Sequence, residues 1–143
     1  MSTNEQRVAE IVAEHAAREG AMMPILHDVQ HEFGCVDAAA EAVIARELNL
    51  SRADVHGVVS FYHDFRETAD ARPEVQICRA EACKARGVEA LIPAAEKAAG
   101  DRVRLTTVYC LGLCSAGPSA RVGDRLHARL DASGLADVIE AAR

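Results

Sequence analysis

The sequence predicts an α+β protein in which a small helical bundle precedes a mixed sheet with helices packed on it. Apolar residues recur at helical spacing through the first half and alternate with polar residues in the second. A polar stretch over residues 66–73, ending in Pro73, separates the two halves. Residues 1–72 carry 6 Lys and Arg against 13 Asp and Glu, whereas residues 73–143 carry 10 against 9. We therefore expect two domains, residues 1–70 and residues 71–143.

The first half predicts helices at four places. They are expected over residues 2–20, 24–34, 37–48 and 51–65. Ser2 with Glu5, and Ser51 with Asp54, have the spacing of side chains that cap a helix N-terminus. Pro24 suits the first turn of a helix.

The second half predicts the order β-α-β-β-β-α. The elements are expected over residues 75–77, 80–99, 103–109, 120–122, 126–130 and 133–142. Pro93 is expected to bend or split the first of these helices. Gly123 and Asp124 form a turn that predicts a β-hairpin. This order suits a small sheet with helices on it, for which a thioredoxin-like arrangement is one candidate.

Four of the five cysteines form two pairs in this second half. Cys78 and Cys83 are spaced C-x4-C, and Cys110 and Cys114 are spaced C-x3-C. Each pair begins where a predicted strand ends. If these two strands are parallel neighbours, both pairs emerge at one edge of the sheet, where four thiolates can converge.

Three chemistries can use four thiolates at one point. A two-iron cluster takes four thiolates and suits the wider C-x4-C spacing, so it is favoured. Structural zinc also takes four thiolates, although its pairs are more often C-x2-C. A dithiol redox enzyme would need a C-x-x-C pair, which the sequence lacks. Zinc, disulfides and inert thiols stay open as alternatives.

The residues that flank the cysteines favour an anionic site. Arg79, Lys84 and Arg86 surround the first pair, and Gly112 gives the second pair the backbone freedom of a wrapping loop. The basic residues are equally consistent with an ordinary solvated helix face.

Other residues predict no second site. Cys35 is expected to be a buried hydrophobic residue between helices. His27 and His31 are four residues apart but lack a third ligand, which favours a surface or packing role. Three of the five aromatic residues lie close together: Phe61, Tyr62 and Phe65. They are expected either to pack in the core or to lie in or under a docking surface for another subunit.

Charge and composition exclude several classes of function. The net charge of −6 argues against a nucleic-acid-binding protein, and no apolar stretch approaches a membrane span. The first residues lack the basic flank and apolar core of a secretory signal, so we expect a cytoplasmic protein with reduced thiols. No nucleotide-binding, phosphate-binding or serine-nucleophile motif is present. An electron carrier is favoured over an enzyme that acts alone.

Four motifs in the correct order resemble the family of thioredoxin-like [2Fe-2S] ferredoxin subunits of NADH dehydrogenases. Residues 23–30 resemble the family's P-x-L-x-x-V-Q stretch, and residues 55–65 resemble V-x-G-V-x-[ST]-F-Y-x-x-F. The two cysteine pairs match its C-x4-C and C-L-G-x-C motifs, and the resemblance runs from about residue 5 to residue 140.

The resemblance implies a thioredoxin-like ferredoxin domain preceded by a helical domain. It implies one [2Fe-2S] cluster and docking on a flavin- and NAD-binding subunit. The implied ligands are Cys78, Cys83, Cys110 and Cys114.

Within the family, the chain looks most like the gamma subunits of soluble NAD-dependent formate dehydrogenases. Residues 78–83 resemble the C-R-A-E-[SA]-C run of that branch, the segment over residues 100–109 is short, and Cys35 replaces a common respiratory Tyr. This implies an electron-transfer subunit without turnover of its own. Its partners would be a flavin- and NAD-binding beta subunit and a molybdopterin-containing alpha subunit, where formate is oxidised. The alternatives are the equivalent subunit of a respiratory NADH dehydrogenase or NAD-linked hydrogenase, and a zinc-stabilised interaction module.

Overall fold

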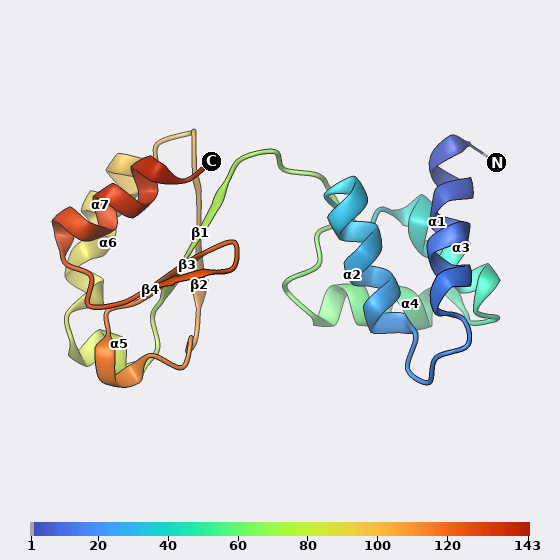
Figure 1. Cartoon of the computed structure of the whole chain (residues 1–143), viewed down its shortest axis with the longest axis horizontal. Coiled ribbons are helices and arrows are strands. Elements are labelled where there is room, and N and C mark those ends of the chain that lie inside the picture. Colours follow the sequence, from blue (N-terminus) through green and yellow to red (C-terminus); the bar gives the residue numbers. More distant parts are fainter. Residues whose placement is uncertain (1) are drawn as a thin grey trace. The chain divides into compact units, whose positions relative to one another are not determined.

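The computed structural model describes residues 2–143 and divides into two compact units, Met1–Ala71 and Arg72–Arg143 (Figure 1). Each unit has a hydrophobic core of its own, so each is described by itself. None of the helices between residues 2 and 143 combines the length and apolar character needed to cross a bilayer.

The first unit is built from helices joined by short loops. They are α1 Thr3–His15, α2 Met22–Phe33, α3 Ala38–Glu47 and α4 Arg52–Phe61. The predicted cap of α1 is confirmed, because the Ser2 hydroxyl accepts the Glu5 N–H and the Glu5 carboxylate accepts the Ser2 N–H. Ser51 and Asp54 form the same reciprocal cap at α4. These caps satisfy N–H groups that a helix start otherwise leaves without partners.

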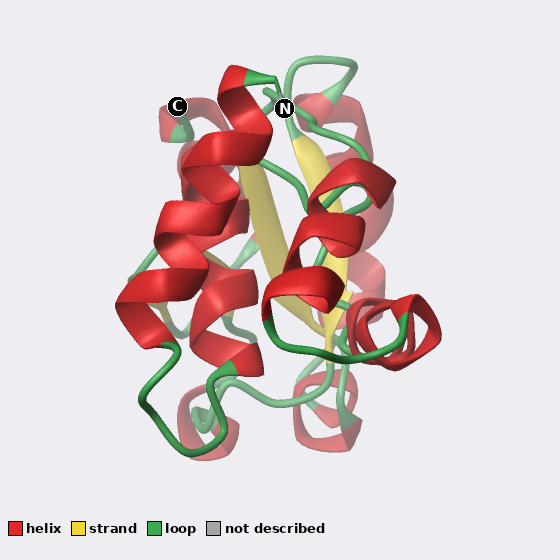
Figure 2. Cartoon of the chain, turned by 90° about the vertical axis from the view of Figure 1, so that its right-hand side faces the viewer, coloured by secondary structure: helices red, strands yellow, loops and turns green. Residues whose placement is uncertain are grey.

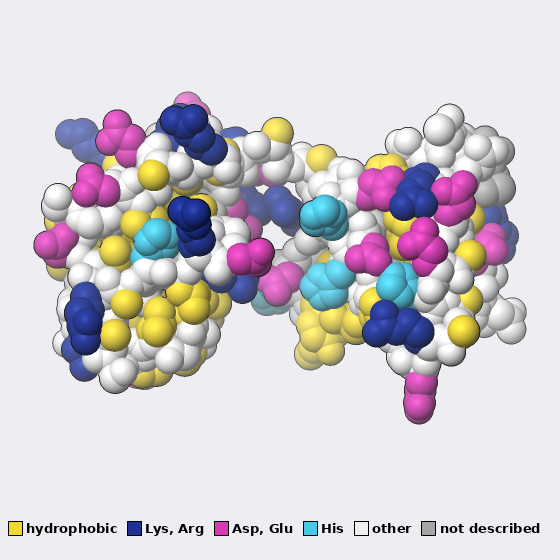
Figure 3. All heavy atoms as spheres, in the orientation of Figure 1, with side chains coloured by type: hydrophobic (Ala, Val, Ile, Leu, Met, Phe, Trp, Pro, Cys, Tyr) yellow, Lys and Arg dark blue, Asp and Glu magenta, His cyan; other side chains and the backbone are white. Residues whose placement is uncertain are grey.

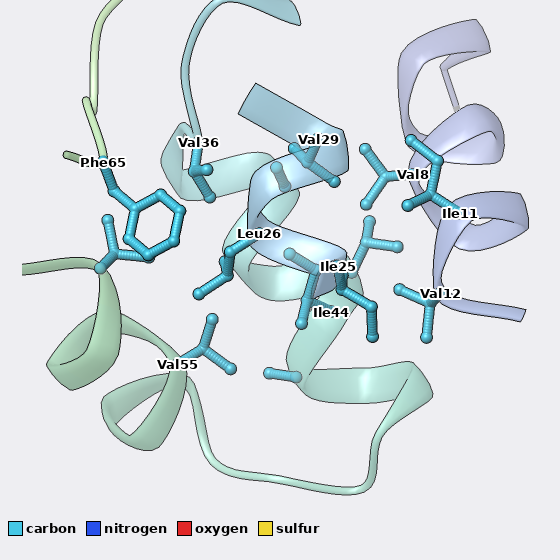
Figure 4. Packing of buried hydrophobic residues seen from close by; sticks show 14 residues of the cluster. Val8, Ile11, Val12, Ile25, Leu26, Val29, Val36, Ile44, Val55 and Phe65 are labelled. Atoms are coloured by element: carbon cyan, nitrogen blue, oxygen red, sulfur yellow. The ribbon is translucent and has the colours of Figure 1, made fainter. Parts of the chain in front are cut away.

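One stripe of each helix faces the core of this unit (Figure 4). Side chains of α1 meet those of α2, and α3 and α4 supply further apolar residues below them. The largest fully buried members are Ile11, Val12, Ile25, Leu26, Val29, Val36, Ile44 and Val55. Each contributes about 1.5–3 kcal/mol when it leaves water, so this core holds the helices together despite the many small alanines.

The aromatic residues after α4 divide between the core and the surface. Phe65 is 7% exposed and packs its ring at 4.9 Å from the ring of His27. Phe61 and Tyr62 are 73% and 45% exposed. Figure 3 shows a hydrophobic surface over the C-terminal end of α4. The expected core packing is therefore confirmed for Phe65, whereas Phe61 and Tyr62 lie on the surface, and a docking role for them stays a prediction.

The second unit contains the sheet, whose strands are yellow in Figure 2. Its elements are β1 Glu74–Cys78, α5 Glu81–Ala85, α6 Val88–Ala99, β2 Arg104–Val108, the short 3-10 helix η1 Cys114–Ala116, β3 Ala120–Val122, β4 Arg125–His127 and α7 Ala132–Ala141. The sheet order is β2-β1-β3-β4. Strands β1 and β2 are parallel, and the other neighbouring pairs are antiparallel. The predicted α+β class, with helices followed by a small mixed sheet, is confirmed.

The expected helix over residues 80–99 is two helices rather than one. The break lies at Gly87, whose φ of 91° an L-residue with a side chain rarely adopts. Pro93 lies inside α6 and does not split it, so the predicted split was wrong, and the bend stays a prediction. Helices α6 and α7 lie side by side on one face of the sheet (Figure 1). The four paired cysteines lie at or after the C-terminal ends of β1 and β2.

Candidate metal centre

The two cysteine pairs lie at the same edge of the sheet because β1 and β2 are parallel and in register. Cys78, the last residue of β1, pairs with Val108, the last residue of β2. Cys110 follows two residues later, and Cys114 begins η1. Helix α5, which carries Cys83, contacts η1. Both cysteine pairs therefore lie at one edge of the sheet, as expected.

The first pair is buried. Cys78 and Cys83 are each 2% exposed. Burial opposes ionisation of Cys78, but hydrogen bonds from backbone N–H groups, that of Ala80 first among them, outweigh burial and lower its pKa. Burial raises the pKa of the Cys83 thiol. The protein therefore supports negative charge on at least one buried sulfur.

The backbone donors to Cys78 come from both cysteine segments. Ala80 lies just ahead of α5, and the other N–H groups are those of Cys110 and Leu111 beyond β2. The loop of the second pair therefore closes over the sulfur of the first. Backbone N–H groups directed at a sulfur favour a negatively charged group there.

The second pair faces solvent. The Sγ atoms of Cys110 and Cys114 are 3.5 Å apart, and both residues are exposed. The Gly112 N–H donates to Cys110 Sγ over 3.3 Å, and Gly112 has the positive φ of 76° expected of a wrapping loop. The adjacent Cys110 thiol raises the pKa of Cys114. Half of the site is thus accessible from outside and half is enclosed.

A close approach by the chain after η1 completes the enclosed half. A side-chain carbon placed on Gly117 would lie 2.9 Å from Cys83 Sγ, which is too close for any real contact. Ser119, two residues on, is buried and places its hydroxyl 3.7 Å from the same sulfur. Nothing in the spacing of the sequence pointed to a contact between Ser119 and this sulfur.

The flanking charged residues are less involved than expected. Arg79 makes a bidentate pair with Glu89, at 2.9 and 2.6 Å, which neutralises it locally. Lys84 and Arg86 are exposed on or after α5. Tyr109, between β2 and Cys110, is 74% exposed. The groups that lower the pKa of Cys78 are chiefly backbone N–H groups rather than these cations.

The residues expected to lie outside the site do so. Cys35 is half-buried in the first unit rather than fully buried, and with Phe33 it lines a cavity of that unit. His27 and His31 are exposed on α2, and the ring of His27 packs on Phe65. A packing role for His27 is confirmed.

The donors present fit an iron–sulfur cluster. Thiolates are the ligands that such clusters take, and N–H groups directed at sulfur stabilise the negative charge of the bound group. Gly117 leaves free the space beside Cys83 Sγ that a side-chain carbon would occupy. No set of three or more His, Cys, Asp and Glu side chains within residues 2–143 is placed to hold a single metal ion.

A mixed sheet that carries two cysteine pairs at the end of a parallel β-α-β unit defines a small iron–sulfur electron-transfer protein. The family model described as thioredoxin-like [2Fe-2S] ferredoxin matches residues 8–143, and the chain belongs to this family. Its cofactor is a [2Fe-2S] cluster, which decides among the chemistries that the cysteine spacing left open.

Curated relatives agree with this assignment. The chain is 31% identical to an NADH-quinone oxidoreductase subunit of Rhizobium meliloti over 99% of its own length and 89% of the relative's. It is 25% identical to the NADP-reducing hydrogenase subunit HndA of Solidesulfovibrio fructosivorans, covering 85% of this chain and 77% of that one. It is 26% identical to the alpha subunit of the NAD-reducing hydrogenase HoxS of Cupriavidus necator, covering 94% of this chain but 24% of that subunit.

A solved structure of a NAD+-reducing [NiFe]-hydrogenase in the H2-reduced state is also similar. The TM-score is 0.67 at 27% identity, over 80% of this chain. The matched region is 21% of the hydrogenase chain, so the chain spans about a fifth of that protein.

Proposed function

We propose that this chain is the [2Fe-2S] electron-transfer subunit of a cytoplasmic NAD-linked oxidoreductase complex. The observation that carries the proposal is the parallel pairing of Cys78 with Val108, which brings both cysteine pairs to one edge. We propose as ligands Cys78, Cys83, Cys110 and Cys114. The bound cluster supplies one-electron chemistry, and the chain supplies the thiolates, the N–H groups and the enclosure on one side.

The complex that we propose is an NAD-dependent formate dehydrogenase. Support comes from the resemblance of residues 78–83 to the formate dehydrogenase branch, from the short segment over residues 100–109 and from Cys35. The named relatives are NADH-quinone oxidoreductase subunits and NAD(P)-reducing hydrogenase subunits, so those two complexes are the alternatives. Tandem purification of the tagged chain from its native host tests the choice. Formate-dependent NAD reduction in the purified complex supports our proposal, and hydrogen- or quinone-dependent activity contradicts it.

The partners that we propose are a flavin- and NAD-binding beta subunit and a molybdopterin-containing alpha subunit. The first unit offers a surface for docking, since Phe61 and Tyr62 are exposed beside a shallow hollow lined by Val59 and His63. We further propose that residues 1–70 and 71–143 are separate domains, with docking and electron transfer divided between them.

The ligand assignment is tested by metal content and spectroscopy of the full chain. Anaerobically purified protein is expected to hold two irons and two sulfides and to give a spin-half EPR signal after dithionite reduction. Replacement of any one of the four cysteines by Ser is expected to lower iron content or alter the signal. Cys35→Ser is the matched control and should leave both unchanged. One zinc per chain and no signal after cluster reconstitution would contradict the proposal.

A further inference from the structure

Ser119 is a buried polar residue that contacts the first cysteine pair through its side chain and its main chain. It lies between η1 and β3 and is 1% exposed. Its hydroxyl oxygen is 3.7 Å from Cys83 Sγ, within hydrogen-bonding range for sulfur. Its carbonyl oxygen accepts the Cys78 N–H over 3.0 Å. The main-chain bond holds Ser119 against β1 and so fixes the position of its hydroxyl.

The buried Ser119 hydroxyl requires a hydrogen-bond partner, and Cys83 Sγ lies within reach of it. A buried hydroxyl without a partner loses free energy relative to water, and among the described residues Ser119 and Glu41 are the buried polar ones. Cys83 Sγ is the partner that the structure provides for Ser119. When Cys83 is a thiolate, it can only accept, so the hydroxyl donates.

We propose that the Ser119 hydroxyl donates a hydrogen bond to the sulfur of Cys83 and thereby raises the reduction potential of the cluster. This rests on the proposed function, in which Cys83 is a ligand. Uptake of one electron increases the negative charge that the ligand sulfurs share, so a donated hydrogen bond stabilises the reduced state more than the oxidised state. Burial strengthens this difference because water cannot reach the Cys83 sulfur to replace the hydroxyl.

The two cysteine pairs differ in this respect. Cys110 and Cys114 are exposed, so water can donate to their sulfurs whatever side chain stands nearby. Ser115 lies in η1 directly after Cys114 and is exposed. Ser115 is therefore a matched control, because it is a serine next to a proposed ligand whose sulfur water can already reach. Ser119 is a positioning residue that acts through Cys83, and its effect belongs to the enclosed half of the site.

The test is an EPR-monitored redox titration of the full chain with dithionite as the electron donor. At the potential where half of the wild-type protein is reduced, Ser119→Ala is expected to lower the ratio of reduced to oxidised protein about tenfold. For a one-electron couple this corresponds to about 59 mV towards lower potential. Ser115→Ala is expected to titrate as the wild type does. Iron and sulfide are assayed on every sample, so that only proteins with a complete cluster are compared.

A second pair of variants separates the hydroxyl from the size of the side chain. Ser119→Thr and Ser119→Val have nearly the same shape, and only Thr keeps the hydroxyl. Ser119→Thr should titrate near the wild type and Ser119→Val at lower potential, and this comparison holds even if Ser119→Ala fails to retain a cluster. Equal potentials for the Thr and Val variants, or for wild type and Ser119→Ala at full cluster content, would overturn the inference.

Failure of this inference is distinct from failure of the proposed function. If Cys83→Ser retains an unchanged cluster, Cys83 is not a ligand, and both proposals fall together. If Cys83→Ser loses or alters the cluster while Ser119→Ala leaves the potential unchanged, only the role of Ser119 is refuted.

Discussion

The Nδ1 atom of His56 lies 3.1 Å from the Oε1 atom of Glu41, joining α4 to α3. Glu41 is 4% exposed, whereas His56 reaches into solvent. Removing a carboxylate from water is costly unless a partner compensates for it. His56 is that partner, and its protonation makes the stability of the helical unit depend on pH.

We expect the stability of the helical unit to decrease as pH rises through neutrality. The hydrogen bond to Glu41 raises the pKa of His56, with smaller contributions from Glu67, which raises it, and Arg52, which lowers it. The folded pKa therefore lies above the unfolded value of about 6.5. The stabilisation is complete below that unfolded value and is lost as pH rises through the folded pKa.

Urea unfolding of the full chain at several pH values measures this effect. His56→Gln should flatten the decrease in the free energy of unfolding between acidic and mildly alkaline pH. His31→Gln, on the exposed face of α2, is the control and should leave the wild-type pH dependence. An unchanged slope in His56→Gln would contradict the prediction.

Gly117→Ala is expected to disrupt the metal centre. Its new carbon would lie 2.9 Å from Cys83 Sγ, so either the loop or the sulfur must move. We expect lower iron and sulfide content per chain after purification. Gly57→Ala is the matched control, since the position is helical and has open space around it. That variant should keep its cluster and gain roughly 0.5–1 kcal/mol of stability, because Ala favours the helix more than Gly does.

Phe61→Ala is expected to weaken assembly without weakening the fold. Because Phe61 is largely exposed, its removal costs little inside this chain but removes apolar area from the proposed docking surface. Phe65→Ala should instead lower the free energy of unfolding of the helical unit by about 3–5 kcal/mol, because it removes a large side chain from the core. Thermal unfolding of the chain and co-purification with the flavin-binding subunit separate the two effects. Normal co-purification of Phe61→Ala would sink the docking assignment.

Ser51→Ala is expected to destabilise the helical unit by about 1 kcal/mol through loss of the α4 cap. The Ser51 hydroxyl accepts the Asp54 N–H over 3.1 Å in the folded protein. Urea unfolding measures the loss, with Ser133→Ala on the exposed surface of α7 as the control. A loss equal to that of the control would show that the cap is dispensable.

Local chemistry allowed most of the fold to be predicted from the sequence. The caps at Ser2 and Ser51 and the hairpin turn at Gly123 depend on residues near in sequence, and all three are observed. The predicted end of α1 at Gly20 was wrong, because the helix ends at His15. Just beyond it, the Arg18 N–H donates a hydrogen bond to the His15 carbonyl. Tertiary contacts decide such an ending, for His15 also bonds Asp28 of α2.

The metal centre was also predicted only in part from the sequence. Spacing at the strand ends was enough to predict that both cysteine pairs lie at one edge of the sheet, because parallel pairing follows from the β-α-β order. Gly117 and Ser119 were not predicted as parts of the site, since their contacts with Cys83 cross more than thirty residues of sequence. Only the folded chain brings that loop back to β1.

The unequal exposure of the two cysteine pairs also gives the cluster-free protein a distinctive chemical labelling pattern. A water-soluble alkylating reagent meets Cys110 and Cys114 at the surface, whereas Cys78 and Cys83 are shielded by the loops around them. Mass spectrometry of the labelled protein should therefore show modification of the outer pair while the fold is intact. Label on the inner pair would report opening of the loop that contains Gly117. The rate of inner labelling thus measures how often this edge of the protein opens.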